Sequence, residues 1–371
     1  MTPFDECPDR RGSDSSKWSR YPPDVLPMWV ADMDVAVPPP IREALAARIA
    51  HPVFGYAAPD PKLLSVIAAR LGERHGWTVR PEEVSLLPGV VPGINMAARA
   101  LVPPGGAIVY QSPAYPPIRQ VARHWGLRDS PIPAGADAAA LRAALAPGDA
   151  FILCNPHNPT GHVYTPAEVA ALADACLSAG AWIIADEIHC DLLFDRRTHT
   201  PIASLSPEVA RRTVTLMSPG KAFNIAGLKI GFAVMQDADL RARVLGCRLG
   251  MVDSVSGIGM AATLAAFTHC DDWLASLVAA LETNRDHLAR AVATTLPGVR
   301  LTVPHATCLA WLDLRSAGLG PDPAATLLER GRIGLNPGAD FGAAGFARLN
   351  FACPRATLDD GIARIAACLA A

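Results

Sequence analysis

The chain has 371 residues, half of them hydrophobic, with 33 Lys and Arg against 35 Asp and Glu and a formal net charge of −2. A nearly neutral chain has no basic field to recruit nucleic acid or an anionic membrane surface, so we expect its partners to be small molecules or another subunit. Its length and apolar content predict a large buried core and exclude a disordered protein.

The nine cysteines are scattered and include no C-x-x-C pair. Such a set is typical of reduced thiols and indicates neither a disulfide framework nor a zinc site. The N-terminus lacks the basic and apolar regions of a signal peptide, and no uncharged apolar run reaches the ~20 residues of a membrane span. We therefore expect a cytoplasmic protein without a membrane span or a metal site.

The first 50 residues predict an arm followed by a helix. Prolines and aromatic residues dominate the arm, and Ile41, Leu45 and Ile49 recur at helical spacing within residues 40–50. The next segment, which carries Tyr56, reads as a loop because of its Gly and Pro content. An aromatic side chain exposed on this loop can reach a neighbouring molecule.

Short apolar runs alternate with helical segments in the middle of the chain. The predicted strands are 84–87, 107–110, 151–154, 182–185, 213–217 and 230–235, after a helix at 62–75. This alternation is typical of an α/β protein whose mostly parallel sheet is covered by helices. A long helix over 272–295 is expected to link two domains. The last part predicts a compact α+β unit with strands at 308–312 and 346–351 and a closing helix at 358–369.

Three of the predicted strands are followed by polar side chains. Asn155–Gly161 follows the third strand, Asp186 follows the fourth, and Lys221 lies four residues after the fifth. Because strand ends in α/β proteins open onto ligand crevices, these residues indicate a site with an amide, a carboxylate and an amine. Each also has a simpler interpretation: a surface lysine, a helix N-cap and a plain Asn-Pro turn.

This ordered set resembles the pyridoxal-phosphate enzymes of fold type I, the aspartate-aminotransferase superfamily. Within that superfamily the chain is most similar to the cystathionine β-lyase, or cysteine-S-conjugate β-lyase, branch. The segments that carry the likeness are Pro27–Asp34, Asn155–Gly161, Asp186–His189, Lys221–Leu228 and Arg348–Arg355.

The resemblance implies a large cofactor-binding domain and a smaller α+β domain. We expect residues 1–50 to give an arm and a helix to the small domain. Residues 51–285 would then form the large domain that binds pyridoxal 5'-phosphate, and 286–371 would form the C-terminal small domain.

The resemblance also implies roles around the cofactor ring. Lys221 would form the Schiff base and later move the proton of the substrate Cα as general base and acid. Asp186 would pair with the protonated pyridine nitrogen and make the ring an electron sink. Asn158 would donate to the phenolate oxygen, and Tyr115 would stack on the pyridine face unless it is an ordinary half-buried aromatic. His189 stands where many relatives have tyrosine, and would contact either the ring or its hydrogen-bond network.

The phosphate is expected at Gly89, Val90 and Val91, where a helix begins, because free N–H groups and the helix dipole favour an anion there. Ser218 would add a hydroxyl. Lys229 stands where aminotransferases commonly place arginine; it keeps the charge without the bidentate fork, so its role as a phosphate ligand stays open.

Arg348 lies in an apolar strand, where a guanidinium is costly to bury unless an anion meets it. Its planar fork matches the α-carboxylate of an amino acid, and Arg355 is the competitor for that role. Tyr56 resembles the residue that relatives extend across a dimer interface to the partner's phosphate. The resemblance therefore implies a homodimer with shared active sites.

We predict a pyridoxal-phosphate-dependent C–S β-lyase that cleaves cystathionine or related cysteine S-conjugates to a thiol, pyruvate and ammonia. An aminotransferase shares the first steps, and the site residues alone do not separate the two; only the branch likeness of residues 29–34 and 348–355 favours the lyase. A regulatory protein that keeps the fold and the cofactor is a third interpretation, against which intact Lys221 and Asp186 argue.

Overall fold

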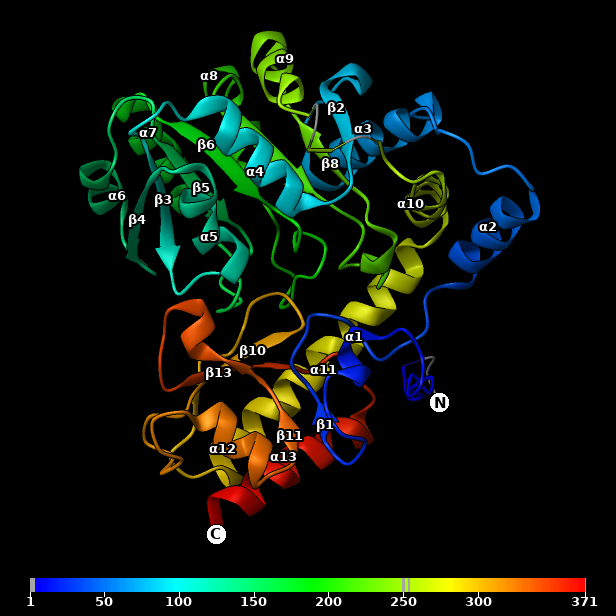
Figure 1. Ribbon diagram of the computed structural model, residues 1–371, viewed down its shortest axis with the longest axis vertical. Helices are drawn as coiled ribbons and strands as arrows, with labels where there is room; N and C mark the ends of the chain where they lie inside the picture. The colour runs from blue at the N-terminus through cyan, green and yellow to red at the C-terminus, as the bar shows by residue number, and fades with distance from the viewer. Residues whose placement is uncertain (1–3, 249–250, 253, 371) are drawn as a thin grey trace.

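A seven-stranded sheet is built from the middle of the chain in the computed structural model, which describes residues 4–248, 251–252 and 254–370 (Figure 1). Its strand order is β2-β8-β7-β6-β5-β3-β4, and only β8 runs against its neighbours. The strands are β2 (Val84–Leu87), β3 (Ala107–Ser112), β4 (Arg128–Pro133), β5 (Ala150–Cys154), β6 (Trp182–Asp186), β7 (Thr213–Met217) and β8 (Gly231–Val234). The predicted mostly parallel sheet is confirmed.

Both faces of this sheet are buried because successive strand side chains enter two different cores. In β5, Phe151 and Leu153 pack into one core and Ile152 into the other. The first core is covered by α6 (Ala138–Ala144), α7 (Pro166–Ala179) and α8 (Pro207–Ala210), and the second by α4 (Val90–Leu101), α5 (Pro116–Trp125) and α9 (Ala238–Gly246). Strands buried on both faces read as continuous apolar runs, which is why the sequence revealed them.

Local signals fix the ends of the covering helices. Thr165 and Glu168 form a reciprocal capping box at the start of α7, and Gly180 ends this helix with a φ of 68°. The helix α3 (Pro61–His75) is also capped by glycine at its C-terminus, where Gly76 has a φ of 63°. Asp60 is its N-cap residue.

A smaller unit lies below the large sheet in Figure 1 and contains a four-stranded antiparallel sheet in the order β12-β13-β10-β9. A parallel pair joins β1 of the N-terminal arm to β11 of this unit. The strands are β1 (Leu26–Pro27), β9 (Arg300–Leu301), β10 (Leu309–Asp313), β11 (Ile333–Gly334), β12 (Asn336–Pro337) and β13 (Phe346–Asn350). The helices are α12 (Pro323–Glu329) and α13 (Arg355–Ala370).

The helix α11 (Asp271–Thr295) runs from the large sheet's side of the molecule into the smaller unit (Figure 1). Its Leu274, Leu281 and Leu288 belong to a core shared with β10, β13 and α13. The arm helix α1 (Ser16–Ser19) lies near this unit, whereas α2 (Pro39–Ala50) packs on α10 (Gly257–His269). The domain boundaries at residues 50 and 285 stay a prediction.

The large sheet contains one strand that the sequence did not predict, and the two-residue strands β1, β9, β11 and β12 were not predicted either. β4 reads Arg-Asp-Ser-Pro-Ile-Pro and lies at the sheet edge, where prolines are tolerated and most side chains are exposed. The described part of the chain also contains four short 3-10 helices: η1 (Pro81–Glu83), η2 (Ile202–Ser204), η3 (Ala226–Leu228) and η4 (Gly338–Phe341). Among the described residues, no helix combines the length and hydrophobicity that crossing a bilayer requires.

Candidate active site

A cavity of about 320 Å³ opens at the carboxyl ends of β5, β6 and β7, facing the smaller unit. It is lined by every expected site residue except Tyr56. These residues are Gly89, Val90, Val91, Tyr115, Asn158, Asp186, His189, Ser218, Lys221, Lys229 and Arg348.

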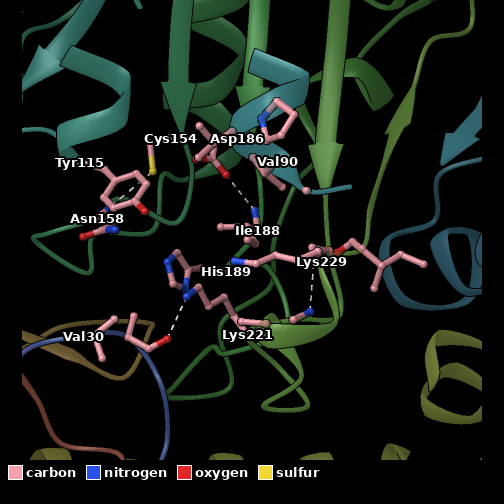
Figure 2. Close-up of a pocket in the computed structure, with 18 of the residues that line it drawn as sticks. Val30, Val90, Tyr115, Cys154, Asn158, Asp186, Ile188, His189, Lys221 and Lys229 are labelled. Atoms are coloured by element: carbon pink, nitrogen blue, oxygen red, sulfur yellow. Dashed lines mark hydrogen bonds between the residues drawn. The ribbon is translucent and has the colours of Figure 1, made fainter. Parts of the chain in front are cut away.

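Lys221 lies in the turn that follows β7, and its amine extends to the opposite wall of the cavity (Figure 2). There Nζ donates to the backbone oxygen of Ala31 at 2.8 Å. Burial lowers the pKa of this amine, and the nearby guanidinium of Arg348 lowers it further. A lowered pKa increases the fraction of free amine, which is the nucleophilic form.

Asp186 ends β6 and is 4% exposed. The backbone N–H of Ile188 donates to its Oδ1 at 3.3 Å, and the residues after β6 form a turn and not a helix. The alternative of a helix N-cap is therefore wrong. Burial raises the pKa of the Asp186 carboxyl to about 7, although the Ile188 hydrogen bond and the Lys221 amine lower it. A cationic group beside it would compensate this burial.

His189 is buried three residues after Asp186, and burial lowers its pKa to about 3, with the charges of Lys221 and Arg348 acting in the same direction. The imidazole is therefore neutral at physiological pH. Its Nδ1 has no hydrogen-bond partner among the described residues. A neutral ring with an unused nitrogen can serve a ligand in the cavity as donor or acceptor.

Tyr115 and Asn158 lie beside each other on the other side of the cavity (Figure 2). Tyr115 precedes the first turn of α5, and burial raises the pKa of its phenol. The backbone N–H of Asn158 donates to Sγ of Cys154 at 3.5 Å, which ties the Asn-Pro turn to the end of β5. The two side chains present an aromatic face and an amide to the same space.

The end of the cavity near α4 is suited to an anion. α4 begins at Val90, directly after Gly89, whose φ of 148° disfavours any side chain. The first N–H groups of a helix lack intrahelical acceptors, and Gly89, Val90 and Val91 line this end of the cavity. A Cβ on Gly231 would lie 3.0 Å from the Met217 oxygen, so the close packing of β8 here leaves little room for a side chain.

Ser218 and Lys229 complete this end. Ser218 Oγ donates to the oxygen of Ile230 at 2.6 Å and accepts from the N–H of Gly220 at 3.0 Å. Its proton is therefore engaged by the protein. Lys229 adopts a φ of 50°, and its side chain extends into the cavity (Figure 2).

Arg348 enters the cavity from β13 and is 4% exposed. Its Nη1 donates to Asn158 Oδ1 at 2.9 Å, and Nη2 donates to Asn336 Oδ1 at 2.7 Å and to the oxygen of Trp29 at 3.2 Å. All three acceptors are neutral, and Nε has no partner among the described residues. Burial lowers the pKa of Arg348 to about 10. A buried guanidinium without a counter-ion is well suited to bind an anion.

Tyr56 lies outside this cavity. It is 96% exposed on the segment between α2 and α3, together with Val53 at 61% and Phe54 at 58%. Within one chain it therefore contributes nothing to the site.

The structure adds residues that the sequence did not single out, among them Val30, Ala31, Cys154 and Ile188. Val30 and Ala31 lie in the Pro27–Asp34 segment, one of those that carry the family likeness. The position of this segment in the cavity depends on contacts with Lys221 and Asn350, which lie 190 and 320 positions further along the chain. No local pattern predicts such contacts. Among the described residues, no group of three or more His, Cys, Asp or Glu could hold a metal ion.

The cavity fits pyridoxal 5'-phosphate. Its volume is in the usual range for small-molecule sites. It offers a buried carboxylate in Asp186, an amine in Lys221 and a helix N-terminus at Val90 for the ring nitrogen, the aldehyde and the phosphate. The buried Nδ1 of His189, which lines this cavity, has no hydrogen-bond partner among the described residues, as expected where a polar ligand is accommodated.

Comparison with known proteins supports the same reading. A model of the family described as aminotransferase class I and II matches residues 23–365. The chain is 36% identical to the cystathionine β-lyase PatB of Bacillus subtilis strain 168, covering 99% of each protein. It is 35% identical to a cystathionine β-lyase of Corynebacterium glutamicum, over 99% of this chain and 100% of the relative. The crystal structure of a C–S lyase from Staphylococcus hominis with bound pyridoxal phosphate superposes with a TM-score of 0.91 at 27% identity, covering 99% and 98% of the two chains.

Proposed function

Because the chain belongs to the aminotransferase class I and II family, we propose that it is a pyridoxal-phosphate-dependent C–S β-lyase. Its substrates would be cystathionine or related cysteine S-conjugates, and its products a thiol, pyruvate and ammonia. The observation that carries this proposal is one cavity that joins the amine of Lys221, the buried carboxylate of Asp186 and the guanidinium of Arg348, whose acceptors among the described residues are all neutral. The relatives named as lyases over nearly their full length support the reaction type.

An aminotransferase is the alternative, and it has less support. It would use the same residues to bind the amino acid and remove its Cα proton, but would then need a keto acid as second substrate. The family includes aminotransferases by its own description. A regulatory role without turnover is less well supported still, because the nucleophile and both charged anchors are present in one cavity.

Bound pyridoxal phosphate would supply an electron sink that stabilises negative charge at the substrate Cα. Lys221 would hold the cofactor covalently and, once displaced by the substrate amine, take the Cα proton on Nζ. Asp186 would hold a proton on the ring nitrogen through its buried carboxylate. Asn158 would donate its amide to the ring oxygen, while Tyr115 would stack on the ring and His189 would lie against it or its hydrogen-bond network.

Arg348 would orient the substrate by donating hydrogen bonds from its buried guanidinium to the α-carboxylate. The N–H groups of Gly89, Val90 and Val91 would hold the phosphate, with the charge of Lys229 nearby. The hydroxyl of Ser218 would donate to the phosphate if it rotated away from the oxygen of Ile230, to which it donates in this structure. Elimination then requires the thiol to leave from Cβ after the Cα proton has moved to Lys221.

We also propose a homodimer in which Tyr56 reaches the neighbouring phosphate site. Support comes from the exposure of Val53, Phe54 and Tyr56 on one segment, since neighbouring large apolar side chains are seldom left in water without a partner. A cytoplasmic location is proposed from the nine cysteines, all of which are unpaired.

The direct test is incubation of the purified protein with cystathionine and with S-alkylcysteines, scoring pyruvate, ammonia and thiol with and without an added keto acid. A lyase forms all three products without keto acid. Product formation that depends on the keto acid would establish the aminotransferase and overturn the proposal.

A further inference from the structure

Residues 29–35, here called the strap, form one wall of the cavity through Val30 and Ala31 (Figure 2). The strap has little regular secondary structure. Side chains from distant parts of the chain instead engage its backbone. The strap contacts the reactive lysine of the cavity through the Ala31 oxygen, which accepts from Lys221 Nζ at 2.8 Å.

Asn350 holds the strap on both sides of Ala31. This residue is 1% exposed and lies at the end of β13, two positions after Arg348. Its Nδ2 donates to the oxygen of Val30 at 2.6 Å and to that of Asp32 at 2.8 Å, and its Oδ1 accepts from the N–H of Ala352 at 2.8 Å. Every hydrogen-bonding atom of this amide is used on backbone groups.

The geometry around Ala31 follows from these bonds. The N–H of Asp32 donates back to the oxygen of Val30 at 2.9 Å, which closes a tight three-residue turn centred on Ala31. With the flanking carbonyls of Val30 and Asp32 held by Asn350, the carbonyl of Ala31 is directed to Lys221 instead.

Asn224 fastens the other end of the strap to the loop that carries the lysine itself. It lies three residues after Lys221 with a φ of 56°. Its Oδ1 accepts from the N–H of Met33 at 3.0 Å, and its Nδ2 donates to the oxygens of Met33 at 3.0 Å and Val35 at 2.9 Å. The strap and the Lys221 loop are therefore joined by three hydrogen bonds from one side chain.

We propose that Asn350 and Asn224 are positioning residues that fix the strap so that the carbonyl of Ala31 holds the amine of Lys221 whenever that amine is not bonded to the cofactor. The proposal rests on the proposed function where it assigns Lys221 to the cofactor. The carbonyl gives the released lysine a defined acceptor beside the reacting atoms, so the amine does not rotate freely between steps.

The same bond acts on protonation. Burial lowers the pKa of Lys221, and a carbonyl that accepts from the ammonium form opposes this by favouring the charged state. Loss of the strap's anchors should therefore lower the pKa of the lysine further. A purely structural role of the asparagines would not move this quantity.

The test compares Asn350→Ala with Asn284→Ala. Asn284 is 7% exposed and makes the same kind of contacts, since its Nδ2 donates to the oxygens of Phe351 at 3.2 Å and Cys353 at 2.8 Å, but it has no bond to the strap. In protein freed of cofactor, acetylation of Lys221 by acetic anhydride is followed against pH by mass spectrometry of its peptide. We expect the apparent pKa of Lys221 to fall by about one unit in Asn350→Ala and to stay unchanged in Asn284→Ala.

A second variant covers the case in which Asn350→Ala does not fold. Asn224→Gly tolerates the positive φ and removes the three bonds to the strap, so the same shift is expected. An unchanged pKa in a folded strap variant, or an equal shift in Asn284→Ala, would overturn the proposal.

A third measurement uses the cofactor-loaded protein with L-alanine, which has no leaving group on Cβ. Exchange of its Cα proton with deuterium oxide, followed by NMR, should slow about tenfold in Asn350→Ala while the cofactor stays bound, and unchanged exchange would contradict the positioning role. If wild-type protein shows no exchange at all, the proposed function fails, whereas the labelling result still decides the role of the strap.

Discussion

Arg348 donates from Nη1 to Oδ1 of Asn158 at 2.9 Å, which links the expected substrate anchor directly to the expected donor for the cofactor ring. Because the amide oxygen is turned toward the guanidinium, the NH₂ group of Asn158 is left to face elsewhere. The two roles are thus coupled: the residue that would bind the α-carboxylate also orients the amide that would touch the ring.

Lys221→Ala should abolish covalent attachment of the cofactor. Wild-type protein loaded with pyridoxal phosphate and reduced with borohydride should gain the mass of one reduced cofactor on the peptide that contains Lys221, and the variant should gain none. Turnover should fall at least ~100-fold, the lower range for removal of a general base. Labelling at Lys229 in the wild-type protein would show that the wrong lysine had been assigned.

Asp186→Asn should change how the stability of the cofactor-free protein depends on pH. The pKa of Asp186 in the folded protein, about 7, is above its ordinary value of 3.8, so the protonated carboxyl contributes stability that is fully present below pH 4 and is lost as the pH rises to 7. The variant lacks this loss. The free energy of unfolding of Asp186→Asn minus that of wild type should therefore increase by up to about 4 kcal/mol between pH 4 and pH 8, at 1.36 kcal/mol per pKa unit.

Urea unfolding of both cofactor-free proteins at several pH values measures this difference. Bound cofactor should reduce the pH-dependent difference in stability between the two proteins, because a protonated ring nitrogen would stabilise the carboxylate. Two stability curves that run parallel from pH 4 to pH 8 would show that Asp186 ionises as it does in water.

Arg348→Lys should lower kcat/KM for amino-acid substrates by roughly 10- to 100-fold, since the ammonium keeps the charge but cannot form two parallel bonds to a carboxylate. An amine without the α-carboxylate should react equally poorly with both proteins. Arg355→Lys is the matched control, because Arg355 lies at the start of α13 and donates to Asn284 and Thr283 outside the cavity. If kcat/KM fell only in Arg355→Lys, Arg355 and not Arg348 would be the residue that binds the α-carboxylate.

Lys229→Met should weaken binding of pyridoxal phosphate about 3- to 10-fold, a modest effect because the side chain is exposed and its charge is screened. Equilibrium dialysis against the cofactor measures the loss. Lys62→Met, at an exposed position of α3, should leave the affinity unchanged. Equal affinities for all three proteins would show that Lys229 does not assist the phosphate site.

Tyr56→Ala and Lys221→Ala should each be poorly active alone, yet co-expression of the two should restore activity. In a mixed dimer one site combines an intact Lys221 with an intact Tyr56 from the other subunit. Random pairing would give about one quarter of the wild-type activity. Failure of differently tagged, co-purified mixed dimers to regain activity would exclude a shared site.

Much of the fold was accessible from the sequence because its elements carry local signals. Apolar runs marked β5, β6 and β7, and the helix at 272–295 was predicted within one residue of α11. The direction of β8 was not predictable, since a strand buried on both faces looks the same whichever way it runs. The edge strand β4 was missed because exposed positions and prolines give no apolar run.

The candidate site divides in the same way. Asn158, Asp186 and Lys221 could be proposed together because each lies at or just after the carboxyl end of a parallel strand. The carboxyl ends of these strands meet at the same edge of the sheet. The contacts of Asn350 with Val30 and Asp32 join residues more than 300 positions apart, and nothing near either position indicates the other. The exposure of Tyr56, by contrast, agrees with the exposed aromatic loop that the sequence predicts there, because the Gly and Pro content of this segment is a local signal.

The pairing of β1 with β11 sets an order of events during synthesis. Leu26 leaves the ribosome early, but its partner Ile333 follows about 300 residues later. At typical rates of 5–20 residues per second, the first strand waits roughly 15 to 60 s for its neighbour. The large sheet can assemble in that interval, whereas the strap cannot be fixed until Asn350 has been made. A nascent chain therefore acquires the lysine that would capture the cofactor well before it acquires the means to hold that lysine in place.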